Sequence, residues 1–375
     1  MEDKIKILIY NPGLWGGGRE RRTVQLIKGL NAFDWIDVSV MINYRKKAYD
    51  EFYETKARLY YQEERNDRHK IYKNIDLILQ EVKPDIVHSW CESPRDMMPL
   101  LQLKNQYKYK LIAGFVADGN RTGVLTRQNF FNQYYYYNSE AIVSNSKIGL
   151  RAKHAPVKKS YYIPNGFDFA RFDGIKDSLT VRKELEVPDD VFIVTMCARF
   201  TKDKDWGSFL KIAQKAQYES LPTKFIAAGS GPLYEYFVSE AKEKKIENIL
   251  FLGQRNDVES ILCASDICLL LTTGAHQEGF SNSILEAMAA GLPTLASKSG
   301  GTPEVIDEGV NGFLVPVEDW NASYNHLLRL INNKDEMLAV GKQARLKVEN
   351  TYTLPLMTER YIDLYKKLLK IDNLK

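Results

Sequence analysis

Short apolar runs alternate with amphipathic segments along the whole chain, and this alternation limits its possible folds more than any other feature. Residues 4–10, 36–42 and 110–116 are apolar enough for buried strands, whereas 19–30 and 69–82 have the spacing of helices. Repeated strand–helix units favour parallel strands joined by right-handed crossovers. The sequence therefore predicts an α/β fold built on parallel sheets.

The alternation stops near the turn Pro164-Asn165-Gly166 and then starts again. A chain of 375 residues is long enough for two domains of ordinary size. We predict two doubly wound, Rossmann-like domains over residues 1–170 and 171–352, followed by a closing helix within 353–375. The second-half strands are expected at 191–197, 224–228, 249–252, 266–271, 294–296 and 312–315, and the closing helix at 354–369.

Composition excludes several classes of protein. With 44% hydrophobic and 27% charged residues the chain has the composition of a soluble globular protein. No run approaches the ~18–20 apolar residues of a membrane span, and the first residues lack a signal-peptide profile, so we expect a cytoplasmic protein. The four cysteines form no Cys-x-x-Cys pair, which favours reduced thiols over a zinc site or a disulfide.

The net charge of +4 is mild, but basic residues concentrate in the first 70 positions among aromatic ones. Such a surface could meet anionic lipid headgroups at the inner face of the cell membrane or an acidic acceptor, or could be an ordinary solvated face. No nucleic-acid-binding module is present, so no nucleic-acid partner is expected. The basic residues are Arg19, Arg21, Arg22, Lys28, Arg45, Lys46, Lys47, Lys56, Arg58, Arg65, Arg68 and Lys70, and the aromatic ones are Trp35, Tyr44, Tyr49, Phe52, Tyr53, Tyr60 and Tyr61.

Two glutamates, Glu278 and Glu286, lie eight positions apart after the apolar run 266–271. Helical spacing begins at Asn282 and ends at Gly291, which places Glu278 in a strand-to-helix loop and Glu286 about two turns into the helix. Backbone N–H groups at the helix start attract an anion, and the acids would accept hydrogen bonds from sugar or ribose hydroxyls. The alternative is a helix start with two solvated acids.

Glycines follow the first predicted strand at Gly13, Gly16, Gly17 and Gly18 and lead directly into a helix. Glycine lets the backbone approach a ligand closely, and a helix start favours phosphate. The loop is not a P-loop, because Arg19 and Glu20 occupy the positions of Lys and Ser/Thr. It is not a dinucleotide fingerprint either, because Arg21 stands where a glycine is needed, and a tight structural turn remains the alternative.

Three further side chains follow predicted strands. Arg199 and Lys204 come after the first strand of the second half, where two cations could clamp a diphosphate. His88 closes the strand 85–88 and could act as a general acid or base or bind an acceptor. Scattered surface cations and a histidine hydrogen-bonded into the fold are the corresponding structural alternatives.

Together these residues resemble the retaining glycosyltransferases of family 4, which have the GT-B fold. The resemblance covers essentially the whole chain. It implies two Rossmann-like domains that face each other across a cleft, with the C-terminal helix crossing back to the first domain. The segments that carry it are 16–21, 163–168, 198–200 with Lys204, 228–232 and 278–288.

The resemblance implies a role for each matching residue. Arg199 and Lys204 would bind the diphosphate of a nucleotide-sugar donor, Glu286 would hold its ribose, and Glu278 would orient the sugar at its reacting carbon. Donor contacts are also implied for Gly279, Phe280, Ser281, Asn282, Gln254, Arg255 and Gly17, and acceptor-side contacts for Gly18, Arg19 and Arg21. No metal and no cofactor are implied.

The sequence departs from the family on the acceptor side. Many members carry a histidine after the strand corresponding to 110–116, where this chain has Asp118, and a second one where it has Trp90. Either Asp118 takes the histidine's role beside His88, or the acceptor is bound differently. The resemblance predicts an enzyme that moves a hexosyl unit from a UDP- or GDP-linked sugar to a saccharide or lipid-linked acceptor, with retention and without a metal, in bacterial surface polysaccharide or glycolipid synthesis. A nucleotide-sugar 2-epimerase with the same fold is the alternative.

Overall fold

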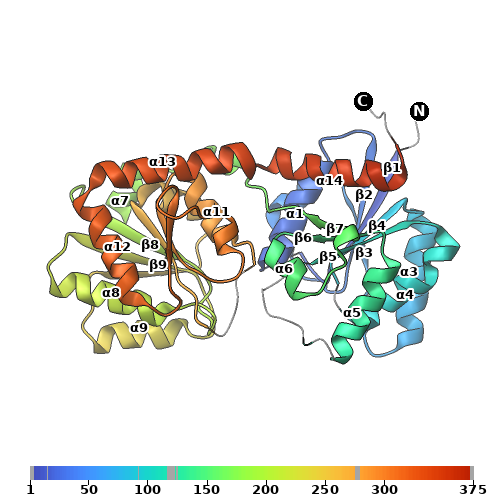
Figure 1. The fold of residues 1–375 in the computed structure, drawn as a ribbon, viewed down its shortest axis with the longest axis horizontal. Helices are drawn as coiled ribbons and strands as arrows, with labels where there is room; N and C mark the ends of the chain where they lie inside the picture. Colours follow the sequence, from blue (N-terminus) through green and yellow to red (C-terminus); the bar gives the residue numbers. More distant parts are fainter. Residues whose placement is uncertain are drawn as a thin grey trace. The chain divides into compact units, whose positions relative to one another are not determined.

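The computed structural model describes residues 4–14, 16–91, 93–115, 123, 126–274 and 279–371. The chain divides into two compact units (Figure 1), the first formed by Met1–Gly166 with Leu354–Lys375 and the second by Phe167–Thr353. The boundaries expected from the sequence are 170 and 352. Helix α14 (Leu354–Leu369) packs against α1 (Gly18–Leu30) within the first unit.

The first unit contains a seven-stranded parallel sheet in the order β3-β2-β1-β4-β5-β6-β7. Strand β3 was not expected from the sequence. It lies at the edge of the sheet with its side chains half-buried or exposed, so it lacks the apolar run that reveals a central strand. The strands are β1 (Ile5–Tyr10), β2 (Ile36–Ile42), β3 (Arg58–Tyr61), β4 (Ile86–Ser89), β5 (Lys110–Phe115), β6 (Ala141–Ser144) and β7 (Ser160–Tyr162).

Helices cover both faces of this sheet (Figure 1) because side chains alternate along each strand. On β1, Ile5, Ile7 and Ile9 pack with apolar residues of α1 and α14, whereas Leu8 and Tyr10 pack with those of α3, α4 and α5. The remaining helices are α2 (Asp50–Tyr53), α3 (Arg68–Val82), α4 (Pro94–Tyr107), α5 (Arg127–Asn138), α6 (Lys147–Ala152) and the short 3-10 helix η1 (Val157–Lys159).

The second unit contains a six-stranded parallel sheet in the order β10-β9-β8-β11-β12-β13. Its larger apolar core lies between the sheet and α8, α9 and α12, and another packs α11 and α13 against β11 and β12. The strands are β8 (Phe192–Cys197), β9 (Thr223–Ala228), β10 (Ile249–Gly253), β11 (Ile267–Leu270), β12 (Thr294–Ser297) and β13 (Gly312–Val315). The helices are η2 (Phe169–Phe172), α7 (Ser178–Glu184), α8 (Trp206–Tyr218), α9 (Tyr234–Glu243), α10 (Val258–Ala264), α11 (Asn282–Ala289), η3 (Thr302–Glu304), α12 (Trp320–Asn332) and α13 (Lys334–Thr351).

Both sheets have the same doubly wound connectivity. Each begins with a central strand, builds outward on one side, and then crosses back to build on the other side. The direction reverses between β1 and β4 in the first unit and between β8 and β11 in the second. Ligands of open α/β sheets bind beyond the carboxyl ends of the strands at such a switch point. The loops after these four strands are therefore the first places to look for a site.

Within the described ranges, no helix is long and apolar enough to cross a membrane. All four cysteines are free thiols, and Cys91 and Cys268 are buried.

Candidate functional site

The loop after β8 carries the two cations that the sequence analysis selected. Arg199 is exposed, whereas the Lys204 side chain is only 12% exposed and its Nζ lies 3.9 Å from Asp203 Oδ2. The loop is held from within, because the indole nitrogen of Trp206 donates to Arg199 O at 3.1 Å. Asp205 then starts α8 by accepting a hydrogen bond from Ser208 N, which ends the loop at a fixed point.

This loop is hydrogen-bonded to the segment that follows β11. Asp205 N donates to Leu271 O at 2.9 Å, and Thr273 N donates to Asp203 O at 3.0 Å. The Thr273 hydroxyl adds a bond to Lys202 O at 2.8 Å, and Lys204 pairs with Thr272 in an isolated antiparallel bridge. The loop with Arg199 and Lys204, the candidate diphosphate-binding residues, is thus joined to the start of the strand-to-helix loop at the β8/β11 switch point.

Glycines after β9 allow a second loop to approach the same region. Gly229 has φ +147° and Gly231 has φ +158°, a backbone conformation that side-chain-bearing residues rarely adopt. A Cβ on Gly229 would lie 1.9 Å from Ala198 O, and one on Gly231 would lie 2.5 Å from Phe200 O. Gly229 and Gly231, which belong to the segment 228–232 that carries the family resemblance, therefore make room for the backbone that carries Arg199.

Residues 279–282 lead into α11. Phe280 is buried and packs edge-on against Tyr352, with ring centroids 5.2 Å apart. Ser281 is the N-cap of α11, yet its side chain makes no capping hydrogen bond, and Asn282 is the first helical residue. Glu286 is the fifth residue of the helix, just over one turn in, which corrects the expected two turns.

Glu286 forms an ion pair that the sequence did not predict. Arg171 Nη2 lies 2.9 Å from Glu286 Oε1 and also forms an ion pair with Glu259 Oε1. All three side chains are between 11% and 17% exposed. Burial, with smaller contributions from the Glu286 and Glu259 carboxylates, raises the pKa of the Cys197 thiol to about 12, which places both acids near the end of β8.

The two residues expected near a nucleotide base follow β10. Gln254 is exposed, and its Oε1 accepts a hydrogen bond of 3.4 Å from the Ser230 hydroxyl. Arg255 forms two hydrogen bonds, of 2.8 and 2.6 Å, with the Asp257 carboxylate. These bonds lower the pKa of Asp257 and raise that of Arg255, so the pair remains charged.

In the first unit the glycine-rich loop opens α1, as expected. Gly17 is the N-cap of the helix and Gly18 its first residue, and a Cβ on Gly17 would lie 2.3 Å from Glu20 Oε2. Arg19 hydrogen-bonds to Glu20 Oε1, and Arg21 pairs with Glu51 at 2.9 Å, so both acceptor-side arginines lie beside carboxylates.

His88 is buried rather than displayed at the strand end. Its ring has no exposed surface, stacks on Trp90 at 4.8 Å, and has Nδ1 3.0 Å from the Tyr365 hydroxyl of α14. Burial, together with the nearby Arg22 guanidinium, lowers the pKa of His88 to about 3. His88 is therefore a neutral imidazole inside the first unit at physiological pH.

Two predicted catalytic residues, Glu278 and Asp118, lie outside the described residues. The early basic residues are described, and the structure pairs several of them with acids. Within this group Arg22 is buried, and ion pairs join Arg21 to Glu51, Arg45 to Glu63, Lys47 to Asp50, Lys56 to Asp34 and Arg58 to Asp37.

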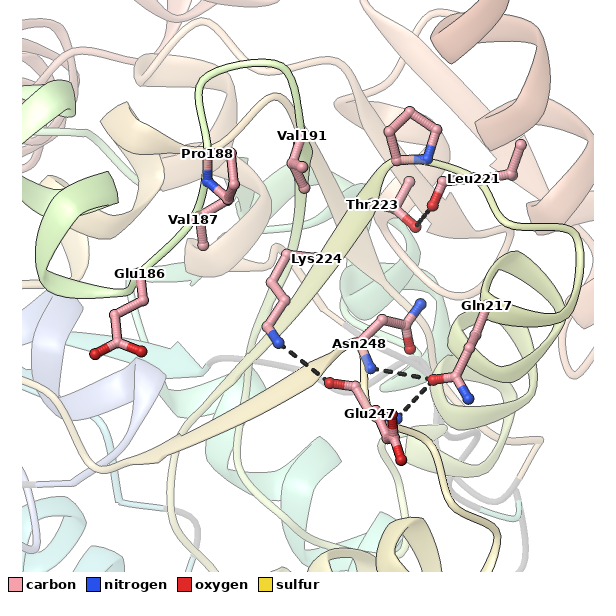
Figure 2. Close-up of a pocket in the computed structure, with 11 residues that line it drawn as sticks. Glu186, Val187, Pro188, Val191, Gln217, Leu221, Thr223, Lys224, Glu247 and Asn248 are labelled. Atoms are coloured by element: carbon pink, nitrogen blue, oxygen red, sulfur yellow. Dashed lines mark hydrogen bonds between the residues drawn. The ribbon is translucent and has the colours of Figure 1, made fainter.

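A surface hollow of about 460 Å³ lies elsewhere on the second unit (Figure 2). It is lined by Thr223 and Asn248, which lie at the amino ends of β9 and β10, opposite the carboxyl ends described above. Its polar groups bond to one another: Gln217 Oε1 accepts from the backbone N–H groups of Glu247 and Asn248, and Lys224 Nζ donates to Glu247 O. This arrangement is typical of a structural surface rather than a ligand site.

The unit that carries Arg199, Lys204 and Glu286 matches a known protein family. Residues 177–347 match the family model described as glycosyl transferases group 1. The matched segment makes up most of the second unit and is similar to that family. It contains Arg199, Lys204 and Glu286, so the resemblance inferred from the sequence is confirmed at the level of the family.

Curated relatives match this chain over part of its length. It is 27% identical over 237 residues to the N-acetyl-alpha-D-glucosaminyl L-malate synthase of Bacillus anthracis, covering 62% of this chain and 61% of the relative. It is 28% identical over 229 residues to the UDP-Gal:alpha-D-GlcNAc-diphosphoundecaprenol alpha-1,3-galactosyltransferase of Escherichia coli, covering 59% and 57%. The chain thus spans somewhat more than half the length of these two relatives.

Solved structures with the same fold cover nearly the whole chain. A glycosyltransferase from Rickettsia africae superposes with a TM-score of 0.84 at 21% identity, over 98% of this chain and all of the other. HepE of Anabaena in complex with UDP superposes with a TM-score of 0.81 at 17% identity, over 97% and 100%. At these identities the likeness establishes the fold, which is GT-B with two α/β units, as predicted.

Proposed function

We propose that this protein is a retaining glycosyltransferase that moves a hexosyl unit from a UDP- or GDP-linked sugar to an acceptor hydroxyl. The observation that carries the proposal is the hydrogen-bonded junction between the Arg199–Lys204 loop and the segment after β11, in the part of the chain that is similar to glycosyl transferases group 1. The names of two relatives include UDP-Gal and GDP-mannose, which supports these two donor classes.

In this proposal, transfer depends on stabilising the departing nucleotide diphosphate. The bond between the anomeric carbon and a phosphate oxygen breaks, and the acceptor oxygen forms the new bond on the same face of the sugar. Arg199, Lys204 and the start of α11 stabilise the negative charge that develops on the diphosphate. The released phosphate oxygen then takes the proton of the acceptor hydroxyl, so the step needs no separate base.

The remaining donor contacts are proposed from the resemblance. Glu286 accepts hydrogen bonds from the ribose hydroxyls, and Glu278 with the backbone from Gly279 to Asn282 orients the sugar. Gln254 and Arg255 flank the base, and Gly17 approaches the diphosphate. Two side-chain cations supply positive charge at the diphosphate, so we propose a reaction that uses no metal and no cofactor.

On the acceptor side we propose that Gly18, Arg19 and Arg21 contact a saccharide or lipid-linked acceptor and that Asp118 assists. His88 then contributes as a neutral, buried support of β4 and α14, in keeping with its lowered pKa and its contact with Tyr365. Pairing of the early basic residues with acids reduces the positive charge available to anionic lipid, so we propose at most a weak peripheral membrane contact.

The biological setting is proposed from the relatives. One relative is named for an acceptor linked to diphosphoundecaprenol, and another is named as a phosphatidylinositol monomannoside mannosyltransferase. Both names support a role in bacterial surface polysaccharide or glycolipid synthesis. The matching family and these two relatives are named as transferases, so the comparisons favour transfer over the 2-epimerase alternative.

A thermal-shift screen with UDP, GDP, ADP and CMP tests the nucleotide first, since a ligand that binds the folded state stabilises it by mass action. Glu278→Ala should then abolish transfer from the corresponding sugar nucleotide and leave the fold intact, which a melting curve would check. Turnover at the wild-type rate in that variant would contradict the proposed role of Glu278. If none of the nucleotides stabilised the protein, the donor assignment itself would fail.

A further inference from the structure

Arg171, Glu259 and Glu286 form a compact charged cluster near the carboxyl end of β8. They come from three different elements, η2, α10 and α11, and are separated by long stretches of sequence. One guanidinium nitrogen, Arg171 Nη2, is shared by the two carboxylates. The cluster therefore ties the helix that carries Glu286 to two neighbours.

The guanidinium is itself held in place by its surroundings. Its Cζ lies 5.1 Å from the centre of the Phe167 ring, and Asp168 caps η2 by accepting a hydrogen bond from Ala170 N. Phe167 packs against Phe169 and Phe172, with centroids 5.2 Å apart in both cases. Because the Arg171 side chain is already held in place, it loses little further conformational freedom when it binds a carboxylate. It can therefore fix the orientation of that carboxylate.

The charge balance of the cluster indicates what it can bind. Two carboxylates share one cation, which leaves an excess of negative charge that disfavours phosphate. Glu286 Oε1 faces Arg171, and the described residues provide no recorded partner for Glu286 Oε2. A carboxylate with one oxygen fixed and the other available is suited to accept hydrogen bonds from hydroxyl groups.

We propose that Arg171 is a positioning residue that fixes Glu286 for the ribose hydroxyls of the bound nucleotide, with Glu259 as the anchor of Arg171. This inference rests on the proposed function, in which Glu286 meets the ribose. It adds that ribose recognition depends on a residue that precedes the matched segment 177–347 and has no need to touch the ligand. The competing explanation is that the cluster only fastens η2 to α10 and α11.

The test compares ligands that differ in the ribose. Calorimetry on the full chain would measure the affinities of UDP, 2′-deoxy-UDP and pyrophosphate, or of the guanosine pair if GDP is the nucleotide that binds. Arg171→Gln should weaken UDP binding about tenfold, the lower range for a hydrogen bond to a charged group. It should remove the preference for UDP over the deoxy form and leave pyrophosphate affinity unchanged.

Arg182→Gln is the matched control, because Arg182 is another arginine of the second unit that pairs with a carboxylate, Asp266, at 2.6 Å. Its ion pair lies where β8 and β11 begin, so its loss should lower stability and leave the ribose preference unchanged. Arg171→Lys keeps the charge and should retain part of the preference. Its affinities can be measured if the glutamine variant fails to fold.

The outcomes separate the two hypotheses. If the wild-type protein binds neither nucleotide, the proposed function and this inference fail together. If the wild type prefers UDP over its deoxy form and both Arg171 variants keep that preference, only the role of Arg171 is overturned. A preference that is lost in Arg171→Gln, reduced in Arg171→Lys and kept in Arg182→Gln supports that role.

Discussion

The two units have the same switch-point topology but present polar residues there in different ways. In the first unit, His88 at the end of β4 and Arg22 on α1 are buried and bonded within the unit. In the second, Arg199 after β8 is exposed, and the loop that carries it is fixed by backbone bonds to the segment after β11. Doubly wound topology therefore selects a location, and the packing around that location decides whether its side chains support the fold or remain available to a ligand.

Arg22 illustrates the structural use. It is 2% exposed, and its guanidinium donates to Asn165 Oδ1, Ile163 O and the Tyr361 hydroxyl. Among the described residues, Arg22 forms no ion pair. These partners lie where the chain leaves the first unit and on the helix with which it returns, so Arg22 fastens both segments to α1.

The largest effect is expected in the second unit. Lys204→Ala should lower the rate of sugar transfer about 10²- to 10³-fold, the usual loss when one donor to a developing negative charge is removed. Steady-state kinetics and a melting curve would measure activity and folding separately. Lys202→Ala removes an exposed cation from the same loop and should change neither, since only the backbone oxygen of Lys202 bonds to Thr273. Equal activity of the two variants would mean that Lys204 does not meet the diphosphate.

A smaller effect, on stability, is expected in the first unit. Arg22→Ala should lower the free energy of unfolding by about 2–4 kcal/mol, because it leaves buried acceptors without a donor and opens a cavity. Urea denaturation would measure the loss. Lys28→Ala, a partly exposed position of the same helix, should stay within about 0.5 kcal/mol of the wild type. If Arg22→Ala were as stable as this control, the buried network would not hold α14.

The smallest effect concerns the pH dependence of stability. The pKa of His88 is about 3 in the folded state and about 6.5 in the unfolded chain, so the unfolded state binds the proton first. The contribution of neutral His88 is fully present above pH ~6.5 and is lost as the pH falls toward 3. Between pH ~6.5 and ~4.5 the wild type should lose about 2 kcal/mol more stability than His88→Asn.

Urea denaturation at several pH values would measure this difference, with His154→Asn as the control because His154 is exposed. Parallel pH curves for the wild type and His88→Asn would show that His88 is accessible to protons in the folded state. In that case the first unit, like the second, would have a charged or titratable side chain available at its switch point.

Much of this could be predicted from the sequence because it depends on local patterns. Strands β2 and β13 and helix α14 have the predicted bounds, because the spacing of apolar residues reflects buried strands and amphipathic helices. Gly229 and Gly231 entered the prediction only through the family resemblance, and the close backbone approach that requires glycine there is visible only in the structure. Edge strand β3 could not be predicted, because an exposed strand needs no apolar run.

The sequence by itself determined the two α/β units, the family resemblance, and the candidate residues Arg199, Lys204 and Glu286. Only the tertiary structure decided that Arg171 and Glu259 hold Glu286, and that Tyr365, 277 positions away, covers His88. Local periodicity reports which residues face a core, but a contact between distant segments depends on how whole elements pack. For that reason a strand-end histidine and a strand-end arginine look alike in the sequence and have opposite environments in the fold.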